Sequence, residues 1–489
     1  MGWGLALLPG VPSVQLDPDL VFRLFLPPIL FSAAYFTSWR DFHANIRPIT
    51  QLAIGCVLLT TVAVALVAHA VIADLSWAAA FVLGAIVAPP DAVAATAIFS
   101  RLGAPRRLVT VLEGESLVND ASALVAYRFA VIAVVTGTFS LVSAAGRFTL
   151  MAAGGIAIGL LAGWLMSRII PAIGSPPVAI TASLLMPVSI YLLAEHLEVS
   201  GVLATVVAGL VHGRRGSEIF DPNIRMAGET VWNFVVFLCN ALVFILIGLQ
   251  LRGLRAGLEG RSTSELAVAA AALVLTVIVV RFVWVFTATY LPYLMNHPAA
   301  DSASPSWRTP LIESWAGLRG VVSLAAALAL PLATDDGAPF PNRDLIIMLT
   351  YVVILATLVG QGLTLGPLVR RLGIVAGDEG PREETHARRA AAQAALDRLD
   401  EVAVEPWVPS DLAVKLRARF THVLEQLPES LDPSALDTEH IATHDRLRRE
   451  VIQAQRSAIL DLRDRGEIGD EALHRVERDL DLEELRSEV

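Results

Sequence analysis

The side chains with the clearest capacity for chemistry are three carboxylates inside one apolar stretch, VLEGESLVNDASALV. They are Glu113, Glu115 and Asp120. A charged residue at the centre of a bilayer costs about 2.5–3.5 kcal/mol on insertion scales, and one kept there indicates a functional site. This stretch therefore predicts a buried site for protons or cations, provided that it spans a membrane.

Helical geometry divides the polar residues of this stretch into two directions. At about 100° per residue, Glu113, Ser116 and Asp120 fall in one narrow sector, with Asn119 beside it. Glu115 points roughly 140° away from Asp120 on the same helix. We expect the first set to line a pathway and Glu115 to face another partner.

A second polar site follows a proline pair in the run AIVAPPDAVAATA, where Asp91 comes directly after Pro89 and Pro90. Two prolines interrupt the helical hydrogen bonds, and the peptide groups freed at such a break can bind ions. The alternative is that Asp91 only caps the second half-helix. Both roles are compatible.

A third site is Arg319 in the run ESWAGLRGVVSLAAALALP. A guanidinium in a low-dielectric interior needs a partner, and we expect that partner to be a carboxylate. Glu115 is the predicted partner, because it faces away from the polar sector of its helix. The pair would be structural.

The composition places these sites in a membrane protein. The chain has 489 residues, of which 55% are hydrophobic and 17% charged, and its mean hydropathy is +0.60. These values exclude an ordinary soluble domain. Cys56 and Cys239 lie in apolar runs, so no disulfide framework or Cys-rich metal site is indicated. Neither HExxH nor GxSxG occurs, which argues against metalloprotease and hydrolase chemistry.

Apolar runs of about 20 residues predict transmembrane helices. The first ten residues, MGWGLALLPG, are too short to span and look like the end of a further helix, without the features of a signal peptide. We therefore expect about eleven full spans plus an N-terminal remnant. The predicted spans are 20–37, 48–72, 76–99, 108–137, 146–170, 176–195, 199–212, 229–250, 265–289, 309–331 and 344–369.

Arginines are distributed unevenly between the loops, with twelve on one side and five on the other. The positive-inside rule makes the richer side, and the tail that follows Arg371, cytoplasmic. Residues 372–489 contain 27 acidic and 16 basic residues and show helical apolar spacing. We expect a membrane domain at 1–371 and an acidic helical tail at 372–489. An acidic tail argues against binding to nucleic acid.

Three glycines four residues apart, Gly155, Gly159 and Gly163, mark one face of a predicted helix. Such a face allows another helix to approach closely. The neighbour can belong to the same subunit or to a second one.

Five runs in order resemble the monovalent cation:proton antiporter-1 family, which includes the bacterial Na+/H+ antiporters. The resemblance extends from about Leu16 to Arg371. It implies an all-α polytopic membrane protein with an inverted-repeat antiporter fold, discontinuous crossed helices, a separate dimerisation domain and elevator-like alternation of access. A homodimer is implied. The runs are LDPDLVFRLFLPPILF, GAIVAPPDAVAATAIFSRLGAPRRL, LEGESLVNDASALVAYRFAV, YLLAEHLEVSGVLATVVAGL and WAGLRGVVSLAAALALP.

The resemblance also assigns roles within the motif LVNDA and around it. It makes Asp120 the exchanging carboxylate and Asn119 its neutral neighbour. Ser116 matches a hydroxyl that can coordinate the cation, and Asp91 matches the acid at the helix break. The Na+ ligands implied are Asp120, Ser116 and Asp91.

Elsewhere the resemblance is partial. Glu115 and Arg319 match a buried ion pair that holds the domain together. Pro90 stands where relatives usually have a threonine, and Ser32 stands where many relatives carry an acid.

The expected function is exchange of Na+, or another alkali cation, for H+ by a transporter that is not an enzyme and needs no cofactor. Burial disfavours the charged form of Asp120, whereas a nearby cation favours it, so proton and cation compete. Asn119 in place of a second acid, and the absence of lysine from residues 1–371, suggest electroneutral exchange. We expect the multi-pass chain to lie among the lipids of the plasma membrane.

Three other functions remain open on the residues alone. The same fold can exchange K+ for H+. An intramembrane aspartyl protease would use Asp91 and Asp120 as a pair that shares a proton, although neither lies in a Gly-x-Gly-Asp context. A passive cation channel would need rings of carbonyls or acids, whereas the chain offers single acids.

Overall fold

The computed structural model describes residues 21–137, 141–215, 222–254, 262–295, 306–374, 379–426, 438–465 and isolated positions up to 480. The chain forms two compact units, Met1–Ala376 and Gly377–Val489. The described residues contain no β-strand and only one isolated bridge, between Ala333 and Pro339. The predicted all-α class is confirmed. The predicted N-terminal remnant lies outside the described residues.

Among the described residues of the first unit, six helices are long and apolar enough to cross a membrane. Four shorter apolar helices accompany them: Arg23–Phe36, Trp77–Val87, Val93–Leu102 and Gly201–Gly213. The predicted count of eleven spans stays a prediction. The six candidates are Ile46–Val71, Arg106–Thr136, Thr149–Ala172, Pro176–His196, Thr263–Leu291 and Arg343–Leu372.

Two of the predicted spans are broken in the middle. The span predicted at 76–99 consists of α7 (Trp77–Val87) and α8 (Val93–Leu102), which are separated at the proline pair. The span predicted at 309–331 consists of α16 (Arg308–Trp315) and α17 (Val321–Leu328), which are separated at Gly317–Gly320. The breaks touch, because the Asp91 amide donates to the Leu318 carbonyl at 2.7 Å.

Most helices that surround the breaks pack against one another as one group. In it, α6 (Val57–Val71), α9 (Arg106–Thr136) and α15 (Thr263–Met295) pack around the broken helices, and α18 (Arg343–Ala356) and α19 (Gly362–Leu372) contact α17 and α8. We call this set the break group.

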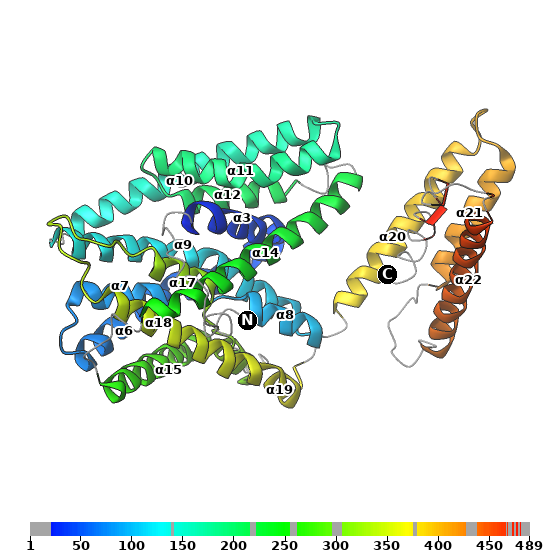
Figure 1. Ribbon diagram of the computed structural model, residues 1–489. Helices are drawn as coiled ribbons and strands as arrows, with labels where there is room; N and C mark the ends of the chain where they lie inside the picture. The colour runs from blue at the N-terminus through cyan, green and yellow to red at the C-terminus, as the bar shows by residue number, and fades with distance from the viewer. Residues whose placement is uncertain are drawn as a thin grey trace. The chain divides into compact units, whose positions relative to one another are not determined.

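A second set packs beside the break group and is called here the flanking group. It comprises α3 (Leu26–Phe36), α10 (Leu141–Ile169), α11 (Pro176–His196) and α12 (Gly201–Gly213). Figure 1 shows these four helices together, with α14 (Pro222–Leu254) running past them toward α17. Only α3 and α12 of this group contact α9 closely along the backbone.

The glycine face of α10 packs against α12 of the same chain. A Cβ atom at Gly159 would lie 2.6 Å from the Ala204 carbonyl oxygen and 2.7 Å from the Val207 Cβ. Gly155 and Gly163 meet Ser200 and Ala208 in the same way. Of the two neighbours that the sequence left open, the structure therefore has the intrasubunit one.

We expect Gly159→Ala to destabilise the protein by about 1–3 kcal/mol, because the added methyl group forces α10 and α12 apart. The matched control is Gly146→Ala on the same helix, where a Cβ meets nothing within 4 Å. This control should be neutral or slightly stabilising, since alanine favours helix. Thermal unfolding of the purified variants compares them. Equal Tm values for the two variants would contradict the packing role of Gly159.

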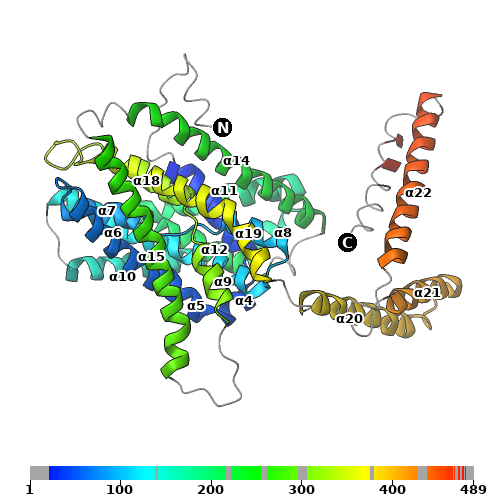
Figure 2. The ribbon, with the colours of Figure 1, turned by 90° about the horizontal axis from the view of Figure 1, so that it is seen from below.

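The second unit consists of three described helices, α20 (Glu379–Val402), α21 (Ser410–Gln426) and α22 (Thr438–Asp464). Figure 2 shows α20 and α21 lying side by side, and an ion pair between Asp400 and Arg417 joins them. Arg388 and Glu384, one turn apart on α20, are paired at 2.6 Å. The described part of the tail is helical, and the side chains of these two ion pairs are exposed.

Candidate functional site

Helix α9 carries the central candidate, Asp120, into the interior of the first unit, where the side chain is only 8% exposed. No described residue donates a hydrogen bond to its carboxylate. Its neighbour Asn119 is fully buried, and its amide nitrogen donates to the Pro90 carbonyl oxygen at 2.9 Å. The Asn119 side-chain oxygen has no hydrogen-bond partner. Two consecutive residues of α9 therefore present a buried carboxylate and a buried amide oxygen that is free to accept.

Asp91 lies at the crossing of the two breaks and contacts both second halves. Its Oδ1 accepts from the Val93 amide at 2.9 Å, at the start of α8. Its Oδ2 accepts from the Val321 amide at 3.4 Å, at the start of α17. Asp91 is close enough to Asp120 for the two carboxylates to interact electrostatically. The capping role weighed from the sequence is present, and it serves two half-helices at once.

Ser116 and Asn119 connect α9 to the first break through hydrogen bonds. The Ser116 hydroxyl oxygen accepts from the Ala92 amide at 3.4 Å, directly after Asp91. The structure thus brings Asp120, Asn119, Ser116 and Asp91 to one place. Glu113, which helical geometry put in the same sector, is exposed at the surface of the first unit.

Glycine is required on the opposite side of the crossing. A Cβ atom at Gly320 would lie 1.6 Å from Asp91 Oδ2, so any other residue would displace this carboxylate. The Gly-Leu-Arg-Gly run of the sequence therefore has a direct steric reason at its last position.

The predicted pairing of Glu115 with Arg319 is wrong. Glu115 instead forms a two-pronged ion pair with Arg281 of α15, at 2.5 Å and 2.8 Å. Both side chains are at most 2% exposed. Arg281 also donates to the Glu313 carbonyl oxygen, at 3.2 Å and 3.1 Å. Its guanidinium lies against Gly317, where a Cβ atom would be 2.3 Å from Arg281 Cδ.

Arg319 is buried with no carboxylate partner among the described residues, and backbone carbonyls accept its hydrogen bonds. Its Nε donates to the oxygen of Val87, the last residue of α7, at 2.8 Å, and its Nη1 donates to the oxygen of Gly317. Its backbone amide donates to the Thr357 hydroxyl at 3.2 Å. Carbonyls at a helix C-terminus lack partners within the helix and carry partial negative charge. They replace the carboxylate that we expected.

The charges at the crossing thus match the ends of the broken helices. Asp91 lies at two N-terminal ends, and Arg319 lies at the C-terminal end of α7. Each charge is stabilised by the partial charge of the helix end beside it. The Asp120 carboxylate accepts no hydrogen bond from a described helix end, so its oxygens are available to bind a proton or a hard cation. The described residues include no group of three or more His, Cys, Asp or Glu that could hold a resident metal ion.

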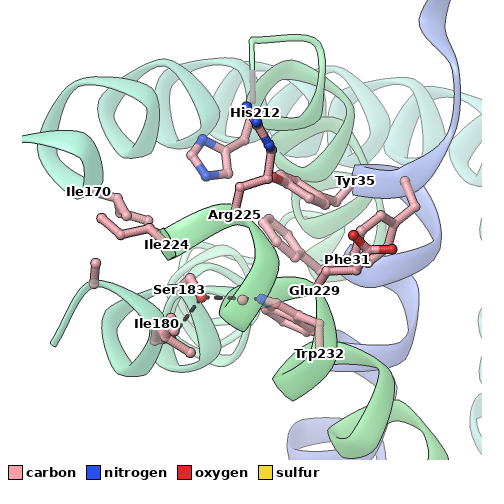
Figure 3. Close-up of a pocket in the computed structure, with 13 residues that line it drawn as sticks. Phe31, Tyr35, Ile170, Ile180, Ser183, His212, Ile224, Arg225, Glu229 and Trp232 are labelled. Carbon is pink, nitrogen blue, oxygen red and sulfur yellow. Dashed lines mark hydrogen bonds between the residues drawn. The ribbon is translucent and has the colours of Figure 1, made fainter. Parts of the chain in front are cut away.

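A cavity of about 60 Å³ in the flanking region contains none of these residues (Figure 3). It is lined by aromatic side chains of α3 and by residues of α11, α12 and α14. His212 is 2% exposed there, and its Nδ1 lies 3.1 Å from the Ser167 hydroxyl. The Trp232 indole donates to the Ser183 hydroxyl at 3.1 Å.

Comparison with known proteins agrees with this architecture. The family model described as "Sodium/hydrogen exchanger, transmembrane" matches residues 2–371. An uncharacterized Na+/H+ exchanger of Mycobacterium tuberculosis H37Rv is 37% identical over 489 residues, which are 99% of this chain and 89% of that protein. The sodium, potassium, lithium and rubidium/H+ antiporter of Bacillus subtilis 168 is 32% identical over 468 residues, which are 94% of this chain and 69% of that protein.

The solved structure of the sodium proton antiporter MjNhaP1 from Methanocaldococcus jannaschii at pH 8 has a similar fold, with a TM-score of 0.56. The match covers 73% of this chain and 88% of that one at 20% identity. Together with the family model and the relatives, it confirms the resemblance that the sequence motifs indicated. The chain belongs to the sodium/hydrogen exchanger family.

Proposed function

We propose that the chain exchanges Na+, or another alkali cation, for H+ across the plasma membrane, and that both ions compete for Asp120. The observation that carries this proposal is the buried Asp120 carboxylate, which receives no hydrogen bond from a described residue. The preceding residue, Asn119, has an unsatisfied side-chain oxygen. A buried carboxylate without donors needs a proton or a cation for its stability. One group that holds either ion, but never both, is sufficient for coupled exchange.

Competition at a single carboxylate gives electroneutral exchange. The second position of the motif is Asn119, which carries no titratable charge, so each half-cycle moves one positive charge through the site. Alternating exposure of Asp120 to the two sides then couples the cation gradient to the proton gradient.

Ser116 and Asp91 are proposed to complete the cation shell with Asp120. Their oxygens accept amide hydrogen bonds at the two breaks, and each oxygen keeps a further lone pair that can face a cation. Asp91 also accepts hydrogen bonds from two helix N-termini, whose partial positive charge favours its charged form. These hydrogen bonds disfavour an aspartyl-protease dyad, in which two carboxylates share a proton.

A specific observation supports a second candidate for the transported cation. The name of the B. subtilis relative includes potassium, lithium and rubidium beside sodium, so K+/H+ exchange by this chain is the alternative. We further propose that the tail that follows residue 371 is cytoplasmic and that the protein is a homodimer, on the arginine distribution and the family resemblance.

Purified protein in proteoliposomes with an acidic interior tests the proposal. Addition of external Na+ should collapse the pH gradient, read as recovery of a quenched amine dye, and Li+ and K+ added separately rank the cations. Clamping the membrane potential at zero with K+ and valinomycin should leave the Na+ rate unchanged. Proton movement that needs no cation, or that follows the imposed voltage, would contradict the proposed exchange.

A further inference from the structure

One ion pair joins the central helix of the site to the flanking group. Arg128 on α9 donates to Glu195 Oε1 on α11 at 2.6 Å. The same Glu195 oxygen accepts the Gly201 amide at 3.2 Å, at the start of α12. Glu195 therefore holds α9, α11 and α12 together at one point.

This pair lies on the continuation of the Asp120 face of α9. Leu124 follows Asp120 by one turn, and Tyr127 and Arg128 follow by two, all within a sector of roughly 100°. Leu124, Tyr127 and Arg128 line a cavity of about 180 Å³ together with Tyr191, Glu195 and Val202. A space that begins one turn beyond Asp120 thus ends at the ion pair.

A second cavity, of about 430 Å³, lies further along α9 and is lined by Ile132, Glu195 and Glu198. Tyr127, Arg128, Glu195 and Ala329 line both cavities, so the ion pair lies between one cavity and the other. Helix α9 runs from Arg106 to Thr136, and the pair lies toward the Thr136 end. By the arginine distribution, this end faces outward.

The Arg128–Glu195 ion pair has the weak interaction energy and the opposite charges expected of a gate that opens and closes. The side chains are 36% and 30% exposed, and such partly hydrated pairs are weak enough to break within a transport cycle. Arg128 without Glu195 would put a positive charge in the path of a cation, whereas the closed pair is neutral and fills the path.

We propose that Arg128 and Glu195 form the outward gate of the pathway to Asp120, closed in this structure. The proposal rests on the proposed function, since a gate needs an ion to pass it. It predicts that neutralising either member exposes the space beside Leu124 to the outside, and that exchanging the two charges closes it again.

The test measures access to a cysteine at position 124. Leu124→Cys is introduced with Cys56→Ser and Cys239→Ser, and proteoliposomes are labelled from outside with a membrane-impermeant thiol reagent. The outward-facing fraction is scored separately by protease digestion of the tail. Arg128→Gln and Glu195→Gln should each raise the labelling rate about fivefold or more, because they shift the population toward the open form. Arg128→Glu combined with Glu195→Arg should return the rate toward that of the parent.

The matched control is Arg106→Gln, which removes a 2.9 Å pair with Asp41 at the other end of α9 and should leave the labelling rate unchanged. Equal labelling in the parent and both single variants would overturn the gate. A charge exchange that labels as fast as the single variants would also overturn it, because general loosening would then explain the effect. Labelling does not require transport, so failure of the gate is distinguishable from failure of cation exchange at Asp120.

Discussion

Asp120→Asn is expected to abolish cation-dependent proton movement in proteoliposomes, down to the rate of protein-free vesicles. Asparagine has nearly the same shape as aspartate but neither binds a proton in this pH range nor carries the charge that attracts a cation. Because the Asp120 carboxylate receives no hydrogen bond from a described residue, the amide breaks no contact of the folded state. We therefore expect loss of exchange without loss of thermal stability.

The matched control for this variant is Asp344→Asn, which removes a carboxylate at the exposed start of α18. It should exchange at the parent rate. Measurable Na+-dependent proton movement in Asp120→Asn would show that another group carries the ion. Loss of exchange together with a large drop in Tm would instead give Asp120 a structural role.

Glu115→Gln is expected to lower the free energy of unfolding by about 3–5 kcal/mol, because it leaves the Arg281 guanidinium buried without a counter-charge. The pair is almost fully enclosed, so water cannot replace the lost carboxylate. Thermal unfolding in detergent, followed by intrinsic tryptophan fluorescence, measures the loss. Arg281→Gln should behave similarly, because it leaves Glu115 uncompensated.

Glu113→Gln is the control, since it removes an exposed carboxylate two residues away on the same helix and should keep the Tm of the parent. Replacing both partners, Glu115→Leu with Arg281→Met, should recover much of the stability lost in either single variant, because no uncompensated charge is left buried. Glu115→Gln with an unchanged Tm would contradict a structural role for the pair.

The sequence was a good guide wherever local chemistry decided the structure. Two consecutive prolines cannot continue a helix, and the span does break there. Asn119 and Ser116 were placed beside Asp120 by helical periodicity alone, and their contacts with Pro90 and Ala92 agree with that placement. The same periodicity turned Glu115 away from Asp120, toward a buried partner.

The identity of that partner depended on contacts that the sequence does not reveal. Glu115 and Arg281 are 166 positions apart, and no local pattern in the sequence links the two residues. Arg319 was assigned a carboxylate because a buried charge needs compensation. The compensation comes from the carbonyl of Val87, which lacks a partner within the helix because α7 ends at the break.

Glu113 shows a second limit. Periodicity gives the direction of a side chain around a helix but not its depth along the axis. Two turns before Asp120, Glu113 on the same face of α9 is exposed at the protein surface.

The most direct test of competition at Asp120 is the apparent KM for Na+, measured as a function of pH in proteoliposomes. If one carboxylate holds either ion, each unit of acidification on the acid side should raise the apparent KM about tenfold while the maximal rate stays constant. A KM for Na+ that does not change with pH, with only the maximal rate falling in acid, would place the proton and the cation on different groups and contradict exchange at a single carboxylate.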